Sequence, residues 1–328
     1  MSAGGAAGFA RPRLGLSRCL ELEACRYDGA RIPSALVRKL APHVELVSVC
    51  PEVAIGLGVP RDTLRLVRGG GGEVRLVQPA TGADLSQRMD AFAQGWLDQA
   101  PPLDGFILKY RSPSCGPGDV RVYAGTDRSP VVGKAPGLFA AALLARRPDL
   151  AVEDEGRLEN ARIRDHFLTR LFAMAALRAL ADAPTMARLV AFHARYKLLL
   201  LVHHQALMRE LGRVVANPRG QAVEAVCTEY AEGFARAMAR PARRVAHVNA
   251  LQHALGHFKD SLQPAERARF IELVDAFVAR RVPLAAPLAV VRSWCARDEH
   301  PWLDGQAWFE PYPQALVEMR DSGKGLEY

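Results

Sequence analysis

Short apolar runs that end at Gly, Pro or Ser constrain the first half of this chain. They cover Leu14–Leu16, Val44–Val49 and Phe106–Leu108. Their length, their β-branched residues and the turn residues that follow are typical of buried strands. Helical spacing marks the intervening residues 34–40 and 85–97. Because the strands alternate with helices, the pattern predicts an α/β, Rossmann-like domain with a largely parallel sheet.

The pattern changes near Ile163. Apolar residues such as Phe167, Leu171 and Met174 now recur three or four positions apart, which places them on one face of a helix. Few strand signals interrupt this part of the chain, so we expect an all-α helical domain of about five or six helices. Its further helical segments are predicted at residues 186–211, 223–238, 245–258 and 264–280.

A chain of 328 residues exceeds the usual size of one hydrophobic core, so two domains are expected. We predict a flexible tail over residues 1–12 and an α/β domain over 13–152. The acidic stretch that begins at Ala151 predicts a linker at 153–162. The helical domain then covers 163–328.

Composition narrows the class of protein. Hydrophobic residues make up 49% and charged residues 24%, which is typical of globular chains. Six cysteines are too few for a disulfide scaffold, and no signal-peptide pattern or membrane span is recognisable. We expect a soluble, cytoplasmic protein with reduced thiols. The net charge of +8 suits an anionic partner such as RNA, although arginine-rich usage across a proteome would give the same balance.

Three cysteines share one setting. Cys19, Cys50 and Cys115 each lie just beyond a predicted strand, and the carboxyl ends of parallel strands meet at one ligand-binding edge. The chain has no CxxC pair, and no closely spaced ligand pair of the kind that structural zinc sites use. Widely spaced thiolates suit an iron–sulfur cluster in which one iron lacks a protein ligand. The alternative is that all three are buried small apolar side chains.

The sequence around these cysteines resembles the thiouracil desulfidase (TudS) family. The motifs are Ser17-Arg-Cys-Leu20 with Arg26-Tyr-Asp-Gly29, then Val49-Cys-Pro-Glu-Val53, then Ser112-Pro-Ser-Cys-Gly116, in this order. The resemblance covers roughly residues 13 to 150. It implies a 4Fe–4S cluster held by Cys19, Cys50 and Cys115, with one open iron for the sulfur of a thiocarbonyl.

The implied reaction is hydrolytic and involves no net redox change. A sulfur-preferring iron would act as a Lewis acid on the thiocarbonyl, and the products would be a uracil ring and sulfide. The reaction also needs a base for water and a proton source, which we place at Glu52 and Ser112. The alternatives are that Glu52 is a helix-start carboxylate and that Ser112 caps a turn.

Further residues match family positions and are candidate substrate contacts. A phosphate contact or an ion pair that braces the loops would explain Arg26 and Asp28 equally well. The substrate-binding candidates are Ser114, Arg26, Asp28 and Lys109, and Arg61 also matches.

The chain departs from the family pattern in two places, directly after Cys19 and directly after Gly29. Glu21 and Arg31 lie in these two stretches, so substrate contacts near them are in doubt. Cys25 replaces an apolar residue of the family. We interpret Cys25, Cys227 and Cys295 as structural.

The helical part resembles a second family, the YbgA-type domain. The resemblance rests on Phe192-His-Ala-Arg-Tyr-Lys197, on residues 252–259 and on residues 309–313. This domain follows TudS-like domains in fusion proteins implicated in removing sulfur from 4-thiouridine in tRNA. The resemblance implies a desulfidase acting on 4-thiouridine in tRNA or on the free thionucleobase or nucleoside. A free-thiouracil desulfidase whose helical domain serves assembly, and a non-enzymatic iron–sulfur sensor, are the alternatives.

Several histidines lie in the helical part. His253 and His257 are four residues apart, which is a spacing that zinc sites use, but no Cys or carboxylate nearby completes a ligand set. Polar packing between helices or contact with RNA is the favoured interpretation, and it extends to His193, His203 and His204. Candidate phosphate contacts and stacking surfaces are Arg195, Lys197, Arg240, Arg243, Arg244, Lys259, Tyr196, Phe258 and Trp308. A position in the core of the helix bundle is the alternative for each aromatic, and we favour it for Phe192 and Phe258.

Overall fold

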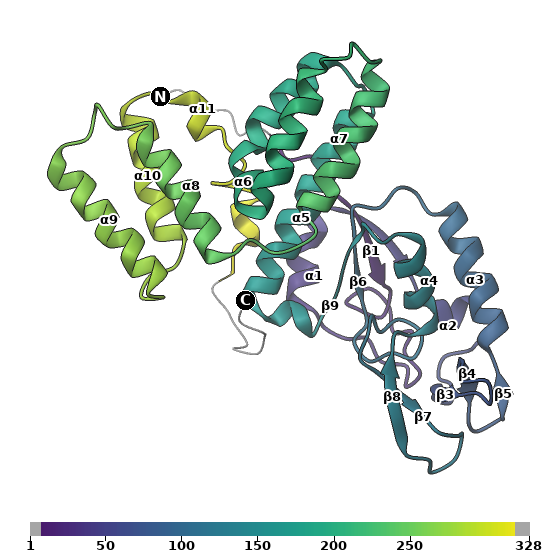
Figure 1. The fold of residues 1–328 in the computed structure, drawn as a ribbon. Helices are drawn as coiled ribbons and strands as arrows, with labels where there is room; N and C mark the ends of the chain where they lie inside the picture. Colours follow the sequence, from purple (N-terminus) through teal and green to yellow (C-terminus); the bar gives the residue numbers. More distant parts are fainter. Residues whose placement is uncertain (1–7, 319–328) are drawn as a thin grey trace. The chain divides into compact units, whose positions relative to one another are not determined.

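The computed structural model describes residues 8–318. These residues form two compact units, one of residues 8–176 with 315–318 and one of residues 177–314 (Figure 1). The division falls inside helix α5 (Ala161–Ala181). A parallel sheet with flanking helices comes first and an all-helical region follows, which confirms the predicted fold class.

The first sheet is a four-stranded parallel sheet with the order β2–β1–β6–β9. Its three predicted strands are confirmed as β1 (Arg13–Ser17), β2 (Glu45–Val49) and β6 (Gly105–Leu108). Because both faces of β1 and β6 are covered, their apolar residues form continuous runs rather than alternating with polar ones. Gly15 lies against Phe106, where a Cβ atom would stand 2.2 Å from the Phe106 ring.

The fourth strand, β9 (Ala151–Asp154), corrects the predicted linker. Its residues pair in parallel with β6, from Ala151 opposite Gly105 to Asp154 opposite Leu108. The prediction of a linker is wrong here because the acidic side chains of Glu153 and Asp154 are untypical of a buried strand. Asp154 is buried, and its carboxylate accepts a hydrogen bond of 2.8 Å from the Arg157 backbone N–H. The burial raises the pKa of Asp154.

Helices cover the sheet. They are α1 (Ala35–Leu40), α2 (Pro51–Ala54), α3 (Ser86–Gln99) and α4 (Leu138–Arg146), and the predicted helices at 34–40 and 85–97 correspond to α1 and α3. The Ser34 hydroxyl caps α1 by accepting from the Val37 N–H. Side chains of α3 and α4 pack on β6, with the Phe106 and Phe139 rings 6.1 Å apart edge to face.

A second, five-stranded sheet was not predicted. Its order is β5–β4–β3–β7–β8. The glycine-rich loop at 69–72 joins β3 and β4 as an antiparallel hairpin. Arginines interrupt the apolar residues at 65–68, 74–78 and 120–123, and Gly133 and Lys134 interrupt those at 131–135, so no long apolar run marks these strands in the sequence. The strands are β3 (Arg65–Arg68), β4 (Val74–Gln78), β5 (Ala83–Asp84), β7 (Val120–Tyr123) and β8 (Val131–Ala135).

The second unit is helical throughout its regular structure. Its longest helix begins where the Thr185 hydroxyl accepts from the Arg188 N–H, and it is kinked at His204. None of the helices in residues 8–318 is both long and apolar enough to cross a membrane. The helices after α5 are α6 (Met186–Ala216), α7 (Val223–Ala237), α8 (Arg244–Gly256), α9 (Pro264–Val278), α10 (Ala285–Arg297) and α11 (Pro301–Asp304).

Candidate functional site

The carboxyl ends of β1, β2 and β6 bring the three motif cysteines together. Cys19 follows β1, Cys50 is the N-cap residue of α2 directly after β2, and Cys115 lies in the turn beyond β6. Burial raises the pKa of Cys19 to about 12, and the negative charge of a Cys50 thiolate contributes to the rise. The pKa of Cys115 is also raised, first by burial and then by Cys19, Glu52 and Cys50. The three thiols therefore interact with one another, with Cys19 and Cys115 buried and Cys50 half-buried.

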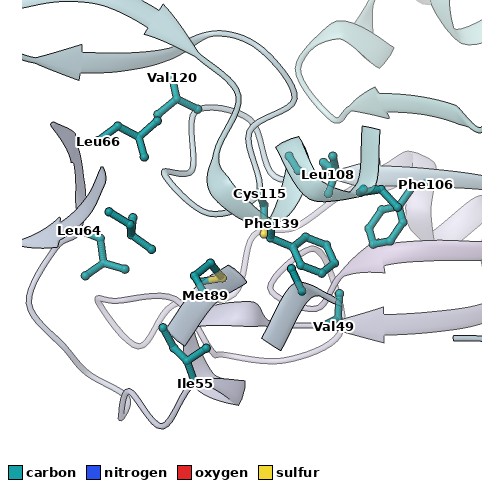
Figure 2. Close-up of a cluster of buried hydrophobic side chains, with 14 of the residues drawn as sticks. Val49, Ile55, Leu64, Leu66, Met89, Phe106, Leu108, Cys115, Val120 and Phe139 are labelled. Atoms are coloured by element: carbon teal, nitrogen blue, oxygen red, sulfur yellow. The ribbon is translucent and has the colours of Figure 1, made fainter. Parts of the chain in front are cut away.

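A tight turn fixes Cys115. The Ser112 hydroxyl oxygen accepts from the backbone N–H groups of Ser114 at 3.2 Å and of Cys115 at 3.1 Å. Gly137 passes so close to this turn that a Cβ atom there would stand 2.6 Å from the Ser114 carbonyl carbon. Ser112 thus caps the turn, as one of its two predicted roles requires. Cys115 itself packs among the buried side chains around Phe139 (Figure 2).

Glu52 is held on both of its oxygens. The Ser114 hydroxyl donates to Glu52 Oε1 at 3.0 Å, and Arg61 binds Oε2 through Nε at 2.8 Å and Nη2 at 2.7 Å. The side chains of Arg61 and Glu52 are only 6% and 13% exposed. The Arg61 guanidinium also donates to the carbonyl oxygens of Cys25 and Gly58, each at 3.1 Å. Arg61 therefore fixes the carboxylate that the sequence marks as the candidate base.

Lys109 lies beside Cys19. Its ammonium group pairs with Glu155, whose carboxylate also accepts from the Tyr110 N–H at 2.7 Å. The Lys109 backbone N–H donates to the Ser17 hydroxyl, and Ser17 in turn hydrogen-bonds to the Cys115 thiol. The positive charge of Lys109 counteracts part of the rise in the pKa of Cys19. Ser17 and Glu155, which sequence reasoning missed, thus support the site.

Arg26 and Asp28 form an ion pair of 3.3 Å at the rim of the same site. Asp28 also accepts from the Ala30 N–H at 3.0 Å, which closes the loop after Cys19. The Arg26 charge favours the thiolate of Cys19. These contacts agree with the loop-bracing interpretation of the pair.

A fourth thiol belongs to this group. Cys25 is buried, and its pKa is raised to about 12 by burial, by the charge of Cys50 and by a hydrogen bond with the Cys50 side chain. The Cys50 Sγ lies 3.8 Å from the Cys25 carbonyl oxygen. The loop between β1 and α1 carries both Cys19 and Cys25, and this shared loop is the one signal that could have found it.

The chemistry and spacing of the side chains decide whether the site fits a single metal ion or an iron–sulfur cluster. In residues 8–318, no three His, Cys, Asp or Glu side chains are close enough to hold a single metal ion. A cluster of several irons separates its ligands more widely than one ion does, and iron–sulfur clusters are bound by thiolates. All the cysteines are free thiols, and cluster binding would displace their protons. The neighbouring thiols, buried at Cys19 and Cys115 and half-buried at Cys50, therefore fit a thiolate-ligated cluster.

The histidines of the helical unit make packing contacts. His193 Nδ1 lies 3.1 Å from the Tyr230 hydroxyl, and His203 Nδ1 lies 2.9 Å from the Arg240 carbonyl oxygen. The imidazole of His204 accepts from the Leu207 N–H where α6 is kinked. These contacts agree with the predicted polar packing.

The three candidate stacking aromatics of this unit are in its core. Tyr196, Phe258 and Trp308 are all buried. The Trp308 indole N–H donates to His247 Nδ1 at 3.1 Å, which satisfies its one donor. The favoured core interpretation of Phe258 agrees with this burial. The interpretation of Tyr196 and Trp308 as a stacking surface is wrong, because helix packing uses their rings.

A parallel sheet with thiols gathered at its strand ends, joined to a helical region, defines a two-part protein with a sulfur-ligand site. The sequence model of the 2-thiouracil desulfurase family matches residues 14–155, and that of a protein family of unknown function (DUF1722) matches residues 197–313. The chain belongs to the family in which a 2-thiouracil desulfurase domain is joined to a YbgA-like domain.

Individual relatives cover the two parts separately. Uncharacterized protein YbgA of Escherichia coli (strain K12) is 32% identical over 164 residues, which is 49% of this chain and 96% of YbgA. Uncharacterized protein YbbK of Bacillus subtilis (strain 168) is 33% identical over 117 residues, which is 34% of this chain and 76% of YbbK. A solved structure described as 4Fe-4S-dependent thiouracil desulfidase TudS is 30% identical, with a TM-score of 0.34, and the match covers 45% of this chain and 93% of that chain.

Proposed function

We propose that this protein is an iron–sulfur-dependent desulfidase that removes sulfur from 4-thiouridine in tRNA or from the free thionucleobase or nucleoside. The products are the uracil ring and sulfide, without net redox change. The observation that carries the proposal is the grouping of Cys19, Cys50 and Cys115, two of them buried and Cys50 half-buried, beside the ion-paired Glu52. Membership of the 2-thiouracil desulfurase family supports the same substrate chemistry.

Cys19, Cys50 and Cys115 would hold the 4Fe–4S cluster. When bound, a cluster with one open iron supplies a Lewis acid that prefers a thione sulfur to oxygen. The chain contributes the positions of the thiols. Lys109 favours the thiolate of Cys19, and the Ser112 turn holds Cys115 in place.

Glu52 is the proposed base. Arg61 occupies Oε2, so that Oε1, which accepts from Ser114, is the oxygen that takes a proton from the attacking water. Ser112 is the proposed proton donor. Its oxygen accepts from two backbone N–H groups, which stabilise negative charge on Oγ and make its hydroxyl proton easier to give up.

Sulfide release from the anaerobically reconstituted full chain tests the proposal, with thiolated tRNA and free 4-thiouracil as substrates. We expect release by the wild type, loss with Cys115→Ser, and a decrease of about 100-fold or more with Glu52→Gln. Cys227→Ser, which changes a thiol of α7 in the helical unit, is the matched control and should retain activity. Iron binding without sulfide release from either substrate would contradict the proposal and favour the sensor alternative.

The proposed tRNA substrate rests on the charge of the helical unit. Lys197, Arg240, Arg243 and Lys259 are exposed there, and the whole chain carries a net charge of +8. Phosphate contacts of this kind weaken steeply with salt. We therefore expect tRNA affinity to fall as salt rises. Absence of tRNA binding would favour the free base as the substrate and an assembly role for the helical domain.

A further inference from the structure

We propose that His257 and His300 form a pH-sensitive switch in the helical unit, in which proton uptake releases helix α11 from its neighbours α8 and α6. His257 is the C-cap residue of α8, and His300 is the N-cap residue of α11. The inference concerns a conformational change inside the helical unit, and it is independent of the proposed desulfidase activity.

The two imidazoles belong to a chain of hydrogen bonds. His300 Nε2 lies 3.2 Å from His257 Nδ1, and His300 Nδ1 accepts from the Leu303 backbone N–H at 3.3 Å. The second bond caps α11, because the first backbone N–H groups of a helix have no partner within it. His300 therefore connects the C-terminal end of α8 to the N-terminal end of α11.

The geometry fixes where the protons of a neutral pair lie. Because His300 Nδ1 accepts a hydrogen bond, the proton of neutral His300 lies on Nε2 and is donated to His257 Nδ1. His257 Nδ1 then carries no proton, and the proton of neutral His257 lies on its own Nε2. Both hydrogen bonds therefore form together only when the two imidazoles are neutral.

An added proton breaks this chain at a defined place. Both ring nitrogens of a protonated imidazole are donors. A proton on His300 Nδ1 faces the Leu303 N–H, so the cap of α11 is lost. A proton on His257 Nδ1 faces the His300 Nε2 proton, so the bond between the two rings is lost. Histidine is the side chain whose ordinary charge change falls between about pH 5 and pH 8.

The charges around the pair determine which imidazole takes the proton. Burial and the charge of His300 lower the pKa of His257. His253 on α8 and Lys197 on α6 lower this pKa further. Asp298, just beyond α10, attracts the positive charge of His300. The surroundings therefore favour protonation of His300 over that of His257, and the cap of α11 is the bond that is lost.

Asp298 keeps its charge and its place while the pair titrates. Hydrogen bonds with Arg297 and Ser261 lower the pKa of Asp298 to about 2. Arg297 Nε lies 2.7 Å from its carboxylate, and Glu266 on α9 pairs with the same Arg297 at 3.1 Å. The pH response therefore comes from the imidazoles. Because the pKa of His257 is lowered, the stability of the neutral pair is present above pH 6.5 and is lost as pH falls through the folded pKa.

Gln306 links α11 to α6. The Trp302 carbonyl oxygen of α11 accepts from Gln306 Nε2 at 3.2 Å. The same nitrogen donates to the Ala194 carbonyl oxygen at 2.8 Å, and Gln306 Oε1 accepts from the Leu198 N–H at 3.1 Å. An α-helix normally pairs these two backbone groups of α6 with each other. Because Gln306 is buried, release of α11 withdraws a hydrogen-bond partner from the interior of the unit.

The switch connects two stretches that the sequence marks. His257 lies in residues 252–259, and Gln306 binds the end of Phe192–Lys197, the other stretch that carries the resemblance to the YbgA-type domain. Lys197 is exposed on this part of α6. Mild acid is therefore expected to loosen the segment of α6 that presents Lys197.

Amide hydrogen exchange of the full chain tests the inference, measured by mass spectrometry from about pH 7.5 to about pH 5 and corrected for the intrinsic rate. We expect the protection of residues 301–306 and 194–198 to fall about fivefold or more, which is the effect of losing one hydrogen bond. His300→Asn keeps an acceptor for the Leu303 N–H but takes up no proton. Its protection should therefore change less than about twofold over the same range.

His253→Gln is the matched control, because His253 lies on α8 outside the hydrogen-bond chain. It should show the pH response of the wild type. An equal fall in the wild type and in His300→Asn would overturn the inference, and so would an unchanged wild type. A fall of the same size throughout α9 would indicate global unfolding and would also overturn it.

A second measurement needs no substitution in the switch. Long-range nitrogen–proton correlations of the labelled wild-type imidazoles report which ring nitrogen carries the proton. At about pH 7.5 we expect the proton of both His257 and His300 on Nε2. A neutral ring with its proton on Nδ1 at either position would contradict the hydrogen-bond chain on which the switch depends.

Discussion

Replacing Arg61 with Met should destabilise the desulfurase domain by about 3 kcal/mol. The substitution keeps the aliphatic stem, but it removes both bonds to Glu52 and leaves that carboxylate with 13% exposure and no counter-ion. Breaking a buried ion pair from one side typically costs about 3–5 kcal/mol, and the residual exposure of Glu52 places this pair at the lower end. For a unit of this size the loss corresponds to a melting temperature lower by roughly 6–12 °C.

A double substitution isolates the charge. Glu52→Gln in the Arg61→Met background removes the uncompensated carboxylate. We therefore expect the double variant to recover about 2 kcal/mol of the free energy of unfolding that Arg61→Met loses. We expect no desulfidase activity from the single or the double variant. Thermal and urea unfolding of the metal-free chain measure both values. Arg146→Met, which breaks an exposed pair with Asp98, is the control and should cost less than about 1 kcal/mol. A cost below about 1 kcal/mol for Arg61→Met, or no recovery in the double variant, would refute the reasoning.

Two further predictions concern pH. Burial raises the pKa of Asp154, so folding disfavours its ionised form, and Asp154→Asn should stabilise the protein at neutral pH. This gain should vanish as pH falls below 3.8, the ordinary pKa, in urea unfolding, and a gain that grows at low pH would contradict it. Burial and Lys197 lower the pKa of His193, so its contribution to stability is present above pH 6.5 and is lost as pH falls through its folded pKa. His193→Gln should therefore lose less stability than the wild type between pH 7.5 and 5, as followed by circular dichroism, and equal losses would exclude this role.

Two of the three strands that the sequence predicts, β1 and β6, are buried almost throughout, whereas β2 is only partly buried. β1 and β6 are covered on both faces, so their apolar residues are contiguous and recognisable. The sequence did not predict β9 because it contains a buried acid, Asp154. A backbone N–H stabilises this carboxylate, and it comes from a turn that only the folded chain forms. The sequence did not predict β3 and β7 of the second sheet, because Arg65 and Arg121 alternate with buried apolar residues over too few positions to show the two-residue period of a strand.

The candidate site also has a part that the sequence predicts and a part that it does not. Cys19, Cys50 and Cys115 follow predicted parallel strands, and topology alone places such residues at one edge. The clamp of Arg61 on Glu52 depends on how the loop after α2 folds back, which no spacing encodes. The closeness of Cys25 to Cys50 likewise arises from packing between two loops, so a residue interpreted as structural lies within the thiol group.

Iron and acid-labile sulfide bound per chain, measured after anaerobic reconstitution of six single Cys→Ser variants, test the central claim most directly. The account predicts a full 4Fe–4S complement in the wild type and its loss in the Cys19, Cys50 and Cys115 variants. The Cys25, Cys227 and Cys295 variants should retain the cluster. Retention by any of the first three, or loss in the Cys25 variant equal to theirs, would contradict the assignment of these three thiols as the ligands.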